Sequence, residues 1–146
     1  MEKRVVITGL GAITPIGNNV NETWKGIENK ECGIDKISLF DSSNFKTSLC
    51  AEVKNYNPLD YFEPKHAKRL DRSSQFALIA AREAVKNSGI TSKNTDFKRV
   101  GIFVGTGIGG LTTIQNQCEV NYEKGNNRVS PMFIPMAIAN MPAGNI

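Results

Sequence analysis

Hydrophobic and polar positions divide the first part of the chain into a strand-like and a helix-like segment. The run Arg4–Ile7 is short, apolar and β-branched, which predicts a buried strand. A glycine-rich loop follows it. Further on, Trp24 and Ile27 lie at the i, i+3 spacing of a helix face, and Asn21 is a suitable residue to cap the helix. The pattern therefore predicts a strand, a loop and a helix in succession.

The strongest helical pattern covers Ser73–Asn87. Asp71 or Ser73 can cap its start, and Gly89 fits the left-handed position after its end. Small side chains recur on one face, at Ala77, Ala80, Ala81 and Ala84. They predict a buried helix that packs closely against its neighbours.

A second strand and helix follow, over Val100–Val104 and from Leu111 to about Glu123. Between the first predicted helix and the helix at Ser73–Asn87, a short strand is expected at Ser48–Val53, with turns at Asn57-Pro58 and Glu63-Pro64. Because strands alternate with helices, we expect an α/β fold with a mainly parallel sheet.

The last segment, residues 130–146, contains three prolines and a run of large apolar side chains at Met132, Phe133, Ile134, Met136, Ile138 and Met141. So much apolar surface needs partners that this chain scarcely provides, and the sequence stops at Ile146 in the middle of an apparent element. We therefore expect the sequence to be the front part of a longer protein.

Composition narrows the class of protein. The 146 residues are 40% hydrophobic and 22% charged, as in ordinary globular domains, and the net charge of +4 is too small to indicate nucleic-acid binding. No run of about 18 apolar residues predicts a membrane span, and no signal-peptide cleavage site follows the N-terminus. Cys32, Cys50, Cys118 and the single His66 show no metal-ligand spacing. Reduced thiols in a cytoplasmic protein are the expectation.

The run "VGIFVGTGIGG" satisfies the G-x-G-x-x-G spacing of dinucleotide-binding loops through Gly105, Gly107 and Gly110. Such a site also needs an acidic residue at the end of the next strand. Here Glu119 and Glu123 fall on a predicted helix instead. The glycine spacing matches but its surroundings do not, so a nucleotide-binding α/β domain is kept only as the alternative function.

Several stretches resemble the β-ketoacyl-acyl carrier protein synthases, the condensing enzymes of fatty acid synthesis. They are "RVVITGLGAITPIGN", "LDRSSQFALIAAREAV", "GIFVGTGIGG" and "RVSPMFIPMAIANMPAGNI", in the family's order and spacing. The similarity is greatest to the elongating type, synthase II. The resemblance implies a thiolase-like fold with αβαβα layers, of which residues 1–146 form the N-terminal part of the first half, and a homodimer when full length.

The resemblance also implies the chemistry, which is acyl transfer without a cofactor. In this family a cysteine accepts the acyl chain, and two histidines support the decarboxylation of malonyl-acyl carrier protein. The three cysteines of this chain and His66 match none of those positions. We therefore expect no catalytic residue here, a domain truncated before its catalytic strand, and no condensation by the chain alone.

A basic stretch, "KHAKRLDR", suggests a docking surface. It places Lys65, Lys68 and Arg69 at i, i+3 and i+4, on one face of a helical turn, with Arg72 nearby. A solvated helix face is the plain interpretation of such a run. The resemblance favours docking instead, because acyl carrier proteins are acidic and the family binds them with basic residues at matching positions.

Apolar residues are implied to contact the fatty acyl chain. Ile108 matches a residue that gates the acyl pocket in this family, while Phe133, Ile134 and Ile138 match a segment near the pocket and the dimer interface. A run of such residues is also common in an ordinary core. A non-catalytic module that only binds the carrier is a third possibility, beside the synthase and the nucleotide-binding domain.

Overall fold

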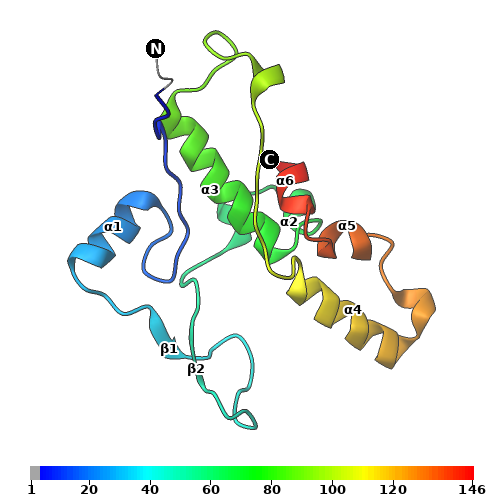
Figure 1. The fold of residues 1–146 in the computed structure, drawn as a ribbon. Coiled ribbons are helices and arrows are strands. Elements are labelled where there is room, and N and C mark those ends of the chain that lie inside the picture. The colour runs from blue at the N-terminus through cyan, green and yellow to red at the C-terminus, as the bar shows by residue number, and fades with distance from the viewer. Residues whose placement is uncertain (1–3) are drawn as a thin grey trace. The chain divides into compact units, whose positions relative to one another are not determined.

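A computed structural model describes residues 4–146, which divide into two compact units. Unit 1 runs up to Tyr56 and also contains Arg82–Ile90, whereas unit 2 comprises Asn57–Ala81 and Thr91–Ile146. The long helix α3 (Arg72–Ser88) contributes its C-terminal turns to unit 1 and its N-terminal turns to unit 2 (Figure 1).

Unit 1 begins its regular structure with helix α1 (Val20–Glu28). The helix was predicted, but its cap is Asn19 rather than Asn21: the Asn19 side chain accepts a hydrogen bond from the Glu22 amide at 2.8 Å. The Glu22 carboxylate in turn accepts one from the amide of Asn18 at 2.8 Å. An acidic residue at the third helical position favours a start at Asn19, since the two side chains then satisfy free amides at the helix end.

A two-stranded antiparallel hairpin completes unit 1. Strand β1 (Ile34–Lys36) pairs with β2 (Leu49–Ala51), with Ile34 opposite Ala51 and Lys36 opposite Leu49. The predicted strand at Ser48–Val53 is thus confirmed over its central residues. Its partner was not predicted, because β1 is short, exposed and partly charged.

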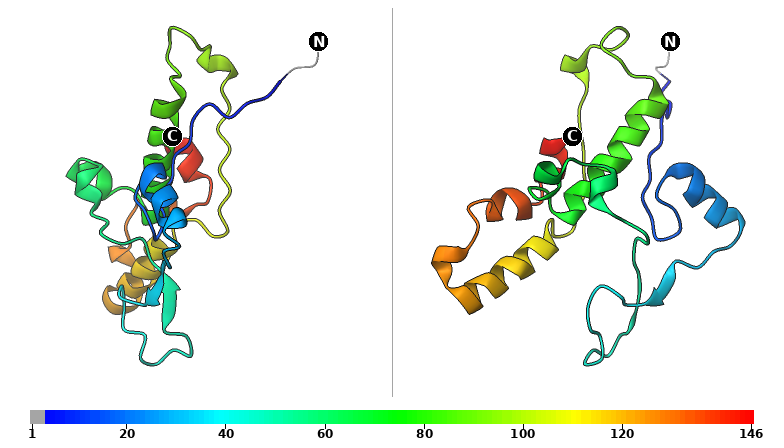
Figure 2. Two further views of the ribbon diagram at one scale, coloured as in Figure 1. Left: turned by 90° about the vertical axis from the view of Figure 1, so that its left-hand side faces the viewer. Right: turned by 180° about the vertical axis from the view of Figure 1, so that it is seen from behind.

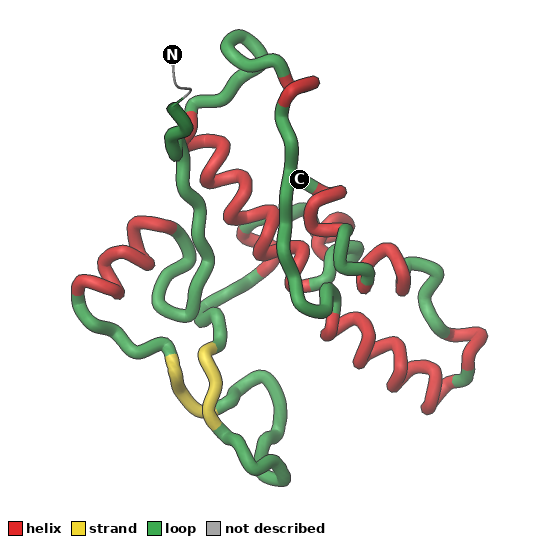
Figure 3. The backbone as a smooth tube through the Cα atoms, in the orientation of Figure 1, coloured by secondary structure: helices red, strands yellow, loops and turns green. Residues whose placement is uncertain are grey.

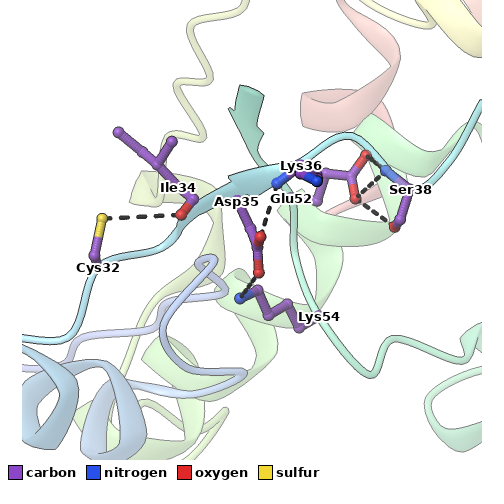
Figure 4. A network of polar contacts seen from close by, with 7 residues as sticks. All are labelled: Cys32, Ile34, Asp35, Lys36, Ser38, Glu52 and Lys54. Atoms are coloured by element: carbon purple, nitrogen blue, oxygen red, sulfur yellow. Dashed lines mark hydrogen bonds and ion pairs between the residues drawn. The ribbon is translucent and has the colours of Figure 1, made fainter. Parts of the chain in front are cut away.

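Polar contacts hold the hairpin (Figure 4). The Glu52 carboxylate accepts hydrogen bonds from the Ser38 hydroxyl at 2.6 Å and from the Ser38 amide at 3.1 Å. These bonds, the hydroxyl's first, lower the pKa of Glu52. The Lys36 amide, and then Lys54 at 3.4 Å, lower the pKa of Asp35.

The predicted strands at Arg4–Ile7 and Val100–Val104 do not form. Both segments are loops, and the β1–β2 hairpin is the sheet that residues 4–146 contain (Figure 3). Val5 and Phe103 are each 96% exposed. A strand requires a hydrogen-bonded neighbour, and the sequence pattern predicts only a segment's preference for burial. The expected parallel sheet is therefore wrong for the described residues.

Unit 2 is helical. Its elements are η1 (Pro58–Asp60), α2 (Pro64–Ala67), the start of α3, η2 (Phe97–Arg99), α4 (Leu111–Lys124), η3 (Asn126–Arg128), α5 (Phe133–Ala137) and α6 (Met141–Asn145). The buried apolar side chains are Phe62, Ala67, Leu70, Leu78, Ile79 and Ala137. The right view of Figure 2 shows α5 returning toward the N-terminal end of α4, where the Ala137 carbonyl oxygen accepts the Gly110 amide. The predicted helix over residues 111–123 is confirmed.

The predicted helix over Ser73–Asn87 is also confirmed as α3, and Gly89 follows it with a φ of +66°. Its buried positions differ from the expected ones. The four alanines are only half-buried, and the buried residues are Ser74, Gln75, Leu78 and Ile79. The backbone at Gly9 nevertheless lies close to α3 at Ala84. A Cβ on Gly9 would collide with the Ala84 carbonyl oxygen.

Candidate functional site

Three basic side chains lie together on α2 and the residues after it. Lys65, Lys68 and Arg69, hereafter the basic turn, are all exposed, while Ala67 and Leu70 between them are buried. This segment therefore has an apolar side in the core and a charged side in solvent. Within residues 4–146 no ion pair engages the basic turn.

The backbone of the basic turn is held by Gln75 from α3. Its buried side-chain amide donates to the carbonyl oxygens of Ala67 at 3.0 Å and Leu70 at 3.2 Å. The Ala67 carbonyl ends α2, where a helix leaves acceptors without partners, and the Leu70 carbonyl lies three residues further on. On the same turn, His66 packs edge-on against Phe62, with ring centroids 5.6 Å apart. The charged side chains thus project from a fixed backbone.

Asp71 binds the first turns of two helices at once. One carboxylate oxygen accepts hydrogen bonds from the amide and hydroxyl of Ser73, both at 2.9 Å, at the start of α3. The other accepts from the amide and hydroxyl of Thr113, at 2.9 and 2.6 Å, in the first turn of α4. The sequence predicted Asp71 as a possible cap of α3. Its bonds to Thr113 had no sequence signal, because 42 positions separate the two residues.

Residues 105–110 are hereafter called the gate loop, after the role predicted for Ile108, and the last two of them lie against the end of α5. The Gly110 amide donates to the Ala137 carbonyl oxygen at 2.9 Å. A Cβ on Gly110 would lie 2.5 Å from the Met136 carbonyl oxygen, and one on Gly109 would lie 2.5 Å from that of Ala137. The glycines are therefore required by the close approach of two backbones.

This contact brings the predicted acyl-pocket residues into one region of unit 2. Ile108 precedes the glycines that touch α5, and Ile138 follows that helix directly. Ile108 is 60% exposed, Ile134 61% and Ile138 44%, whereas Phe133 is half-buried. Apolar side chains exposed in this number are typical of a surface that another molecule or segment covers.

The same geometry does not favour a phosphate site at the gate loop. A dinucleotide loop presents the amides of a helix N-terminus to the pyrophosphate. At α4 the Thr113 amide already donates to the carboxylate of Asp71. Beside the first glycine loop, the adjoining cleft is lined by two carboxylates, Glu22 and Glu31, against one cation, Lys54, a balance of charge that does not favour a phosphate.

The cysteines occupy three different settings. Cys32 is exposed just before β1, Cys118 is exposed on α4, and Cys50 is half-buried in β2. Burial, and then the neighbouring Glu52, raise the pKa of Cys50, which makes its thiolate less available. In the described part of the chain, no group of three or more His, Cys, Asp or Glu side chains is placed to hold a metal ion. None of the helices described has the length and apolar character to cross a membrane.

A family comparison identifies the class of protein. The sequence model described as "Beta-ketoacyl synthase, N-terminal domain" matches residues 2–146. The chain belongs to this family, as the resemblance of its sequence predicted.

Curated relatives agree with the elongating type. The chain is 43% identical over 144 residues to 3-oxoacyl-acyl-carrier-protein synthase 2 of Staphylococcus aureus (strain N315), and 41% identical over 143 residues to the enzyme of that name from Synechocystis. These matches cover 99% and 98% of this chain but 35% and 34% of the relatives. The chain thus spans about a third of their length.

Solved structures show the same fold. One is described as a type II PKS acyl-carrier protein, AntF, in complex with its ketosynthase, AntDE, bound to the hexaketide. It matches with a TM-score of 0.79 and 26% identity, over 99% of this chain and 39% of that chain. A β-ketoacyl synthase from Burkholderia phymatum matches in fold, with a TM-score of 0.77 at 21% identity, over 99% of this chain and 36% of that one. The thiolase-like α/β class is therefore confirmed, although the parallel sheet is not formed among residues 4–146.

Proposed function

We propose that this chain is the N-terminal part of a 3-oxoacyl-acyl carrier protein synthase. Such an enzyme joins an acyl thioester to malonyl-acyl carrier protein, releases carbon dioxide and leaves a 3-oxoacyl-carrier two carbons longer. The family match over residues 2–146 is the observation that carries the proposal. Identity of 43% to a synthase of the elongating type supports the choice of reaction.

Within that enzyme, we propose that residues 1–146 bind and orient substrates and that the reacting side chains lie elsewhere. The resemblance assigns the chemistry to a cysteine at a helix N-terminus and to two histidines. The three cysteines here lie before a strand, within a strand and within a helix. His66, the single histidine, packs on Phe62 in an exposed turn.

The basic turn is the proposed docking site of the acyl carrier protein. Its charges are exposed and free of ion pairs in the described chain, and Gln75 fixes their backbone. An acidic carrier would gain attraction from all three charges and be steered toward them. A ketosynthase of similar fold is described in complex with its acyl-carrier protein, which supports this partner.

The proposed acyl-chain surface comprises Ile108, Phe133, Ile134 and Ile138. Contact with an aliphatic chain would remove the three exposed isoleucines from water, at a gain of about 25 cal/mol for each Å² covered. Ile108 can be repositioned by a turn at Gly107, which has no neighbour within 4 Å of its Cβ position, while Gly109 and Gly110 hold the base of the loop against α5.

The assembly and compartment follow from the same proposal. A homodimer would cover part of the apolar segment at residues 132–138, where Met132 and Ile134 are exposed. All three cysteines are free thiols, as expected of a protein that acts in the reducing cytoplasm.

Acyl transfer to the protein tests this function. The protein, expressed at full length from its own gene, is incubated with acyl-acyl carrier protein. Its intact mass is measured before and after malonyl-acyl carrier protein is added. We expect a mass increase of one acyl group that the malonyl substrate then removes. Carrier binding without an acyl adduct would instead indicate a non-catalytic binding module, and binding of a labelled dinucleotide would revive the alternative domain.

A further inference from the structure

Asp71 stands between the two segments that the proposed function uses separately. The basic turn ends at Arg69, two positions before Asp71 in the sequence. The gate loop ends at Gly110, where α4 begins, and Asp71 accepts two hydrogen bonds from Thr113 in the first turn of that helix. Asp71 therefore lies between the carrier-docking segment, which it adjoins in the sequence, and the base of the gate loop, to which its carboxylate is bonded.

The junction is tightly packed. Asp71 is only 4% exposed, and Thr113 is 7% exposed. A Cβ on Gly110 would lie 2.9 Å from the carboxylate carbon of Asp71, so no side chain fits between them. If the carboxylate turned away, the buried amide and hydroxyl of Thr113 would lose their partner, which is unfavourable. Asp71, Thr113 and Gly110 thus form one stiff unit.

The link to the basic turn is equally short. The Asp71 carbonyl oxygen accepts the amide of Gln75 at 3.0 Å, and the Gln75 side chain donates to Ala67 and Leu70 within the turn. A shift of the basic turn would therefore be felt at Asp71 and, through Thr113, at the start of α4.

We propose that Asp71 is a positioning residue that fixes the gate loop to the basic turn and thereby sets where Ile108 meets the acyl chain. The inference rests on the proposed function. Because Asp71 is only 4% exposed, its proposed action passes through Thr113 and Gly110 rather than through direct contact with a substrate. Weakening its bond to α4 should therefore change which acyl-chain lengths the enzyme accepts, and not only its stability.

The test compares two substitutions at one position. Thr113→Val removes the hydroxyl that donates to Asp71 and keeps the shape of the side chain, whereas Thr113→Ser keeps the hydroxyl as the matched control. The protein expressed from its own gene is assayed with a long-chain and a short-chain acyl-acyl carrier protein, and the ratio of the two kcat/KM values is recorded. We expect Thr113→Val to change this ratio by about threefold or more and Thr113→Ser to leave it within about twofold of wild type.

A double-mutant cycle then shows whether the effect passes through the gate loop. In an Ile108→Ala background, Thr113→Val should change the ratio no further, because the side chain being positioned is absent. Should Thr113→Val not fold, Asp71→Asn is assayed in its place by the same ratio.

Two results would overturn the inference alone. The first is a Thr113→Val variant that melts at a lower temperature but keeps the wild-type ratio of long-chain to short-chain kcat/KM. The second is a change in this ratio that Thr113→Val still causes in the Ile108→Ala background. A wild-type protein that turns over neither substrate would refute the proposed function and this inference with it.

Discussion

Reversing the charge of the three side chains of the basic turn is the perturbation that most directly tests carrier docking. Lys65, Lys68 and Arg69 are replaced together by glutamate. All three side chains are exposed, and the buried Ala67 and Leu70 that anchor the segment are untouched, so the fold should be retained. The expected effect is therefore confined to binding of an acidic partner.

The magnitude follows from the exposure of these charges. An exposed ion pair contributes about 0.2–1 kcal/mol, so the loss of three such attractions costs about 0.6–3 kcal/mol, and charge reversal places the cost in the upper part of that range. Three such changes should lower kcat/KM for acyl transfer from acyl-acyl carrier protein by about 10- to 100-fold, equivalent to about 1.4–2.8 kcal/mol. The loss should shrink as salt is raised from 0.05 to 0.5 M, because screening shortens the range of the interaction.

Two controls separate docking from other effects. An acyl-pantetheine thioester, which carries no acidic protein, should react equally with wild type and variant. A matched triple variant reverses Lys93, Lys98 and Arg99, which are exposed elsewhere in unit 2, and changes the net charge by the same amount. The reasoning is refuted if the basic-turn variant handles carrier-bound substrate normally at low salt, or if the matched variant loses as much.

Three further predictions concern stability and exposure. Asp71→Ala removes the cap of α3 and the acceptor of the Thr113 amide in the first turn of α4, each worth about 1 kcal/mol, and leaves a buried hydroxyl without its acceptor. Urea unfolding should therefore show a loss of about 2–4 kcal/mol, against under about 1 kcal/mol for Asp96→Ala, which removes an exposed cap, and equal losses would contradict the account. The lowered pKa of Glu52 means that its carboxylate stabilises the hairpin above about pH 4.3 and that this stability is lost as the pH falls further. The protection factor of the Ser38 amide, taken against its intrinsic exchange rate at each pH, should fall accordingly, and Glu52→Gln should abolish that dependence. The 146-residue chain by itself should bind a hydrophobic dye through its exposed apolar side chains and unfold with poor cooperativity, whereas one sharp transition without dye binding would indicate a self-contained domain.

The helices could be predicted from the sequence because their signals are local. In α3 the cap at Asp71, the apolar spacing and Gly89 all lie within one stretch, and the structure begins and ends the helix within one residue of the predicted range. At α1 the prediction missed the cap by two positions, since three asparagines, at 18, 19 and 21, compete there. The deciding residue was Glu22, whose carboxylate completes the capping arrangement only with a start at Asn19.

The strands were predicted less well because pairing is not local. Val100–Val104 has the composition of a buried strand, but composition does not identify the neighbour that would supply its hydrogen bonds. Conversely, β1 pairs with β2 although its residues Ile34–Lys36 carry two charges in three positions. A polar strand of this length gives no hydrophobic alternation to recognise.

For the candidate site, sequence spacing found the exposed groups and missed their supports. The i, i+3, i+4 spacing placed Lys65, Lys68 and Arg69 on one turn, and the structure exposes all three. The bond from Thr113 to Asp71 connects residues far apart in the sequence, so no local pattern predicts it.

The glycines of the gate loop were found by their spacing, which suggested a phosphate. Of these, Gly110 lies against the backbone of α5, as does Gly109, whereas Gly105 and Gly107 have no neighbour within 4 Å of their Cβ positions. Spacing therefore identified where a close approach occurs but not what approaches.

The central claim is that this chain is part of a decarboxylating condensing enzyme. It is tested most directly by measuring the fate of the malonyl carboxyl carbon. The protein expressed from its own gene is supplied with acyl-acyl carrier protein and with malonyl-acyl carrier protein labelled at the free carboxyl group. The account predicts one labelled carbon dioxide released for each 3-oxoacyl-carrier formed, with an acyl chain two carbons longer than the primer. No elongated carrier product, or elongation that retains the labelled carboxyl carbon, would contradict it.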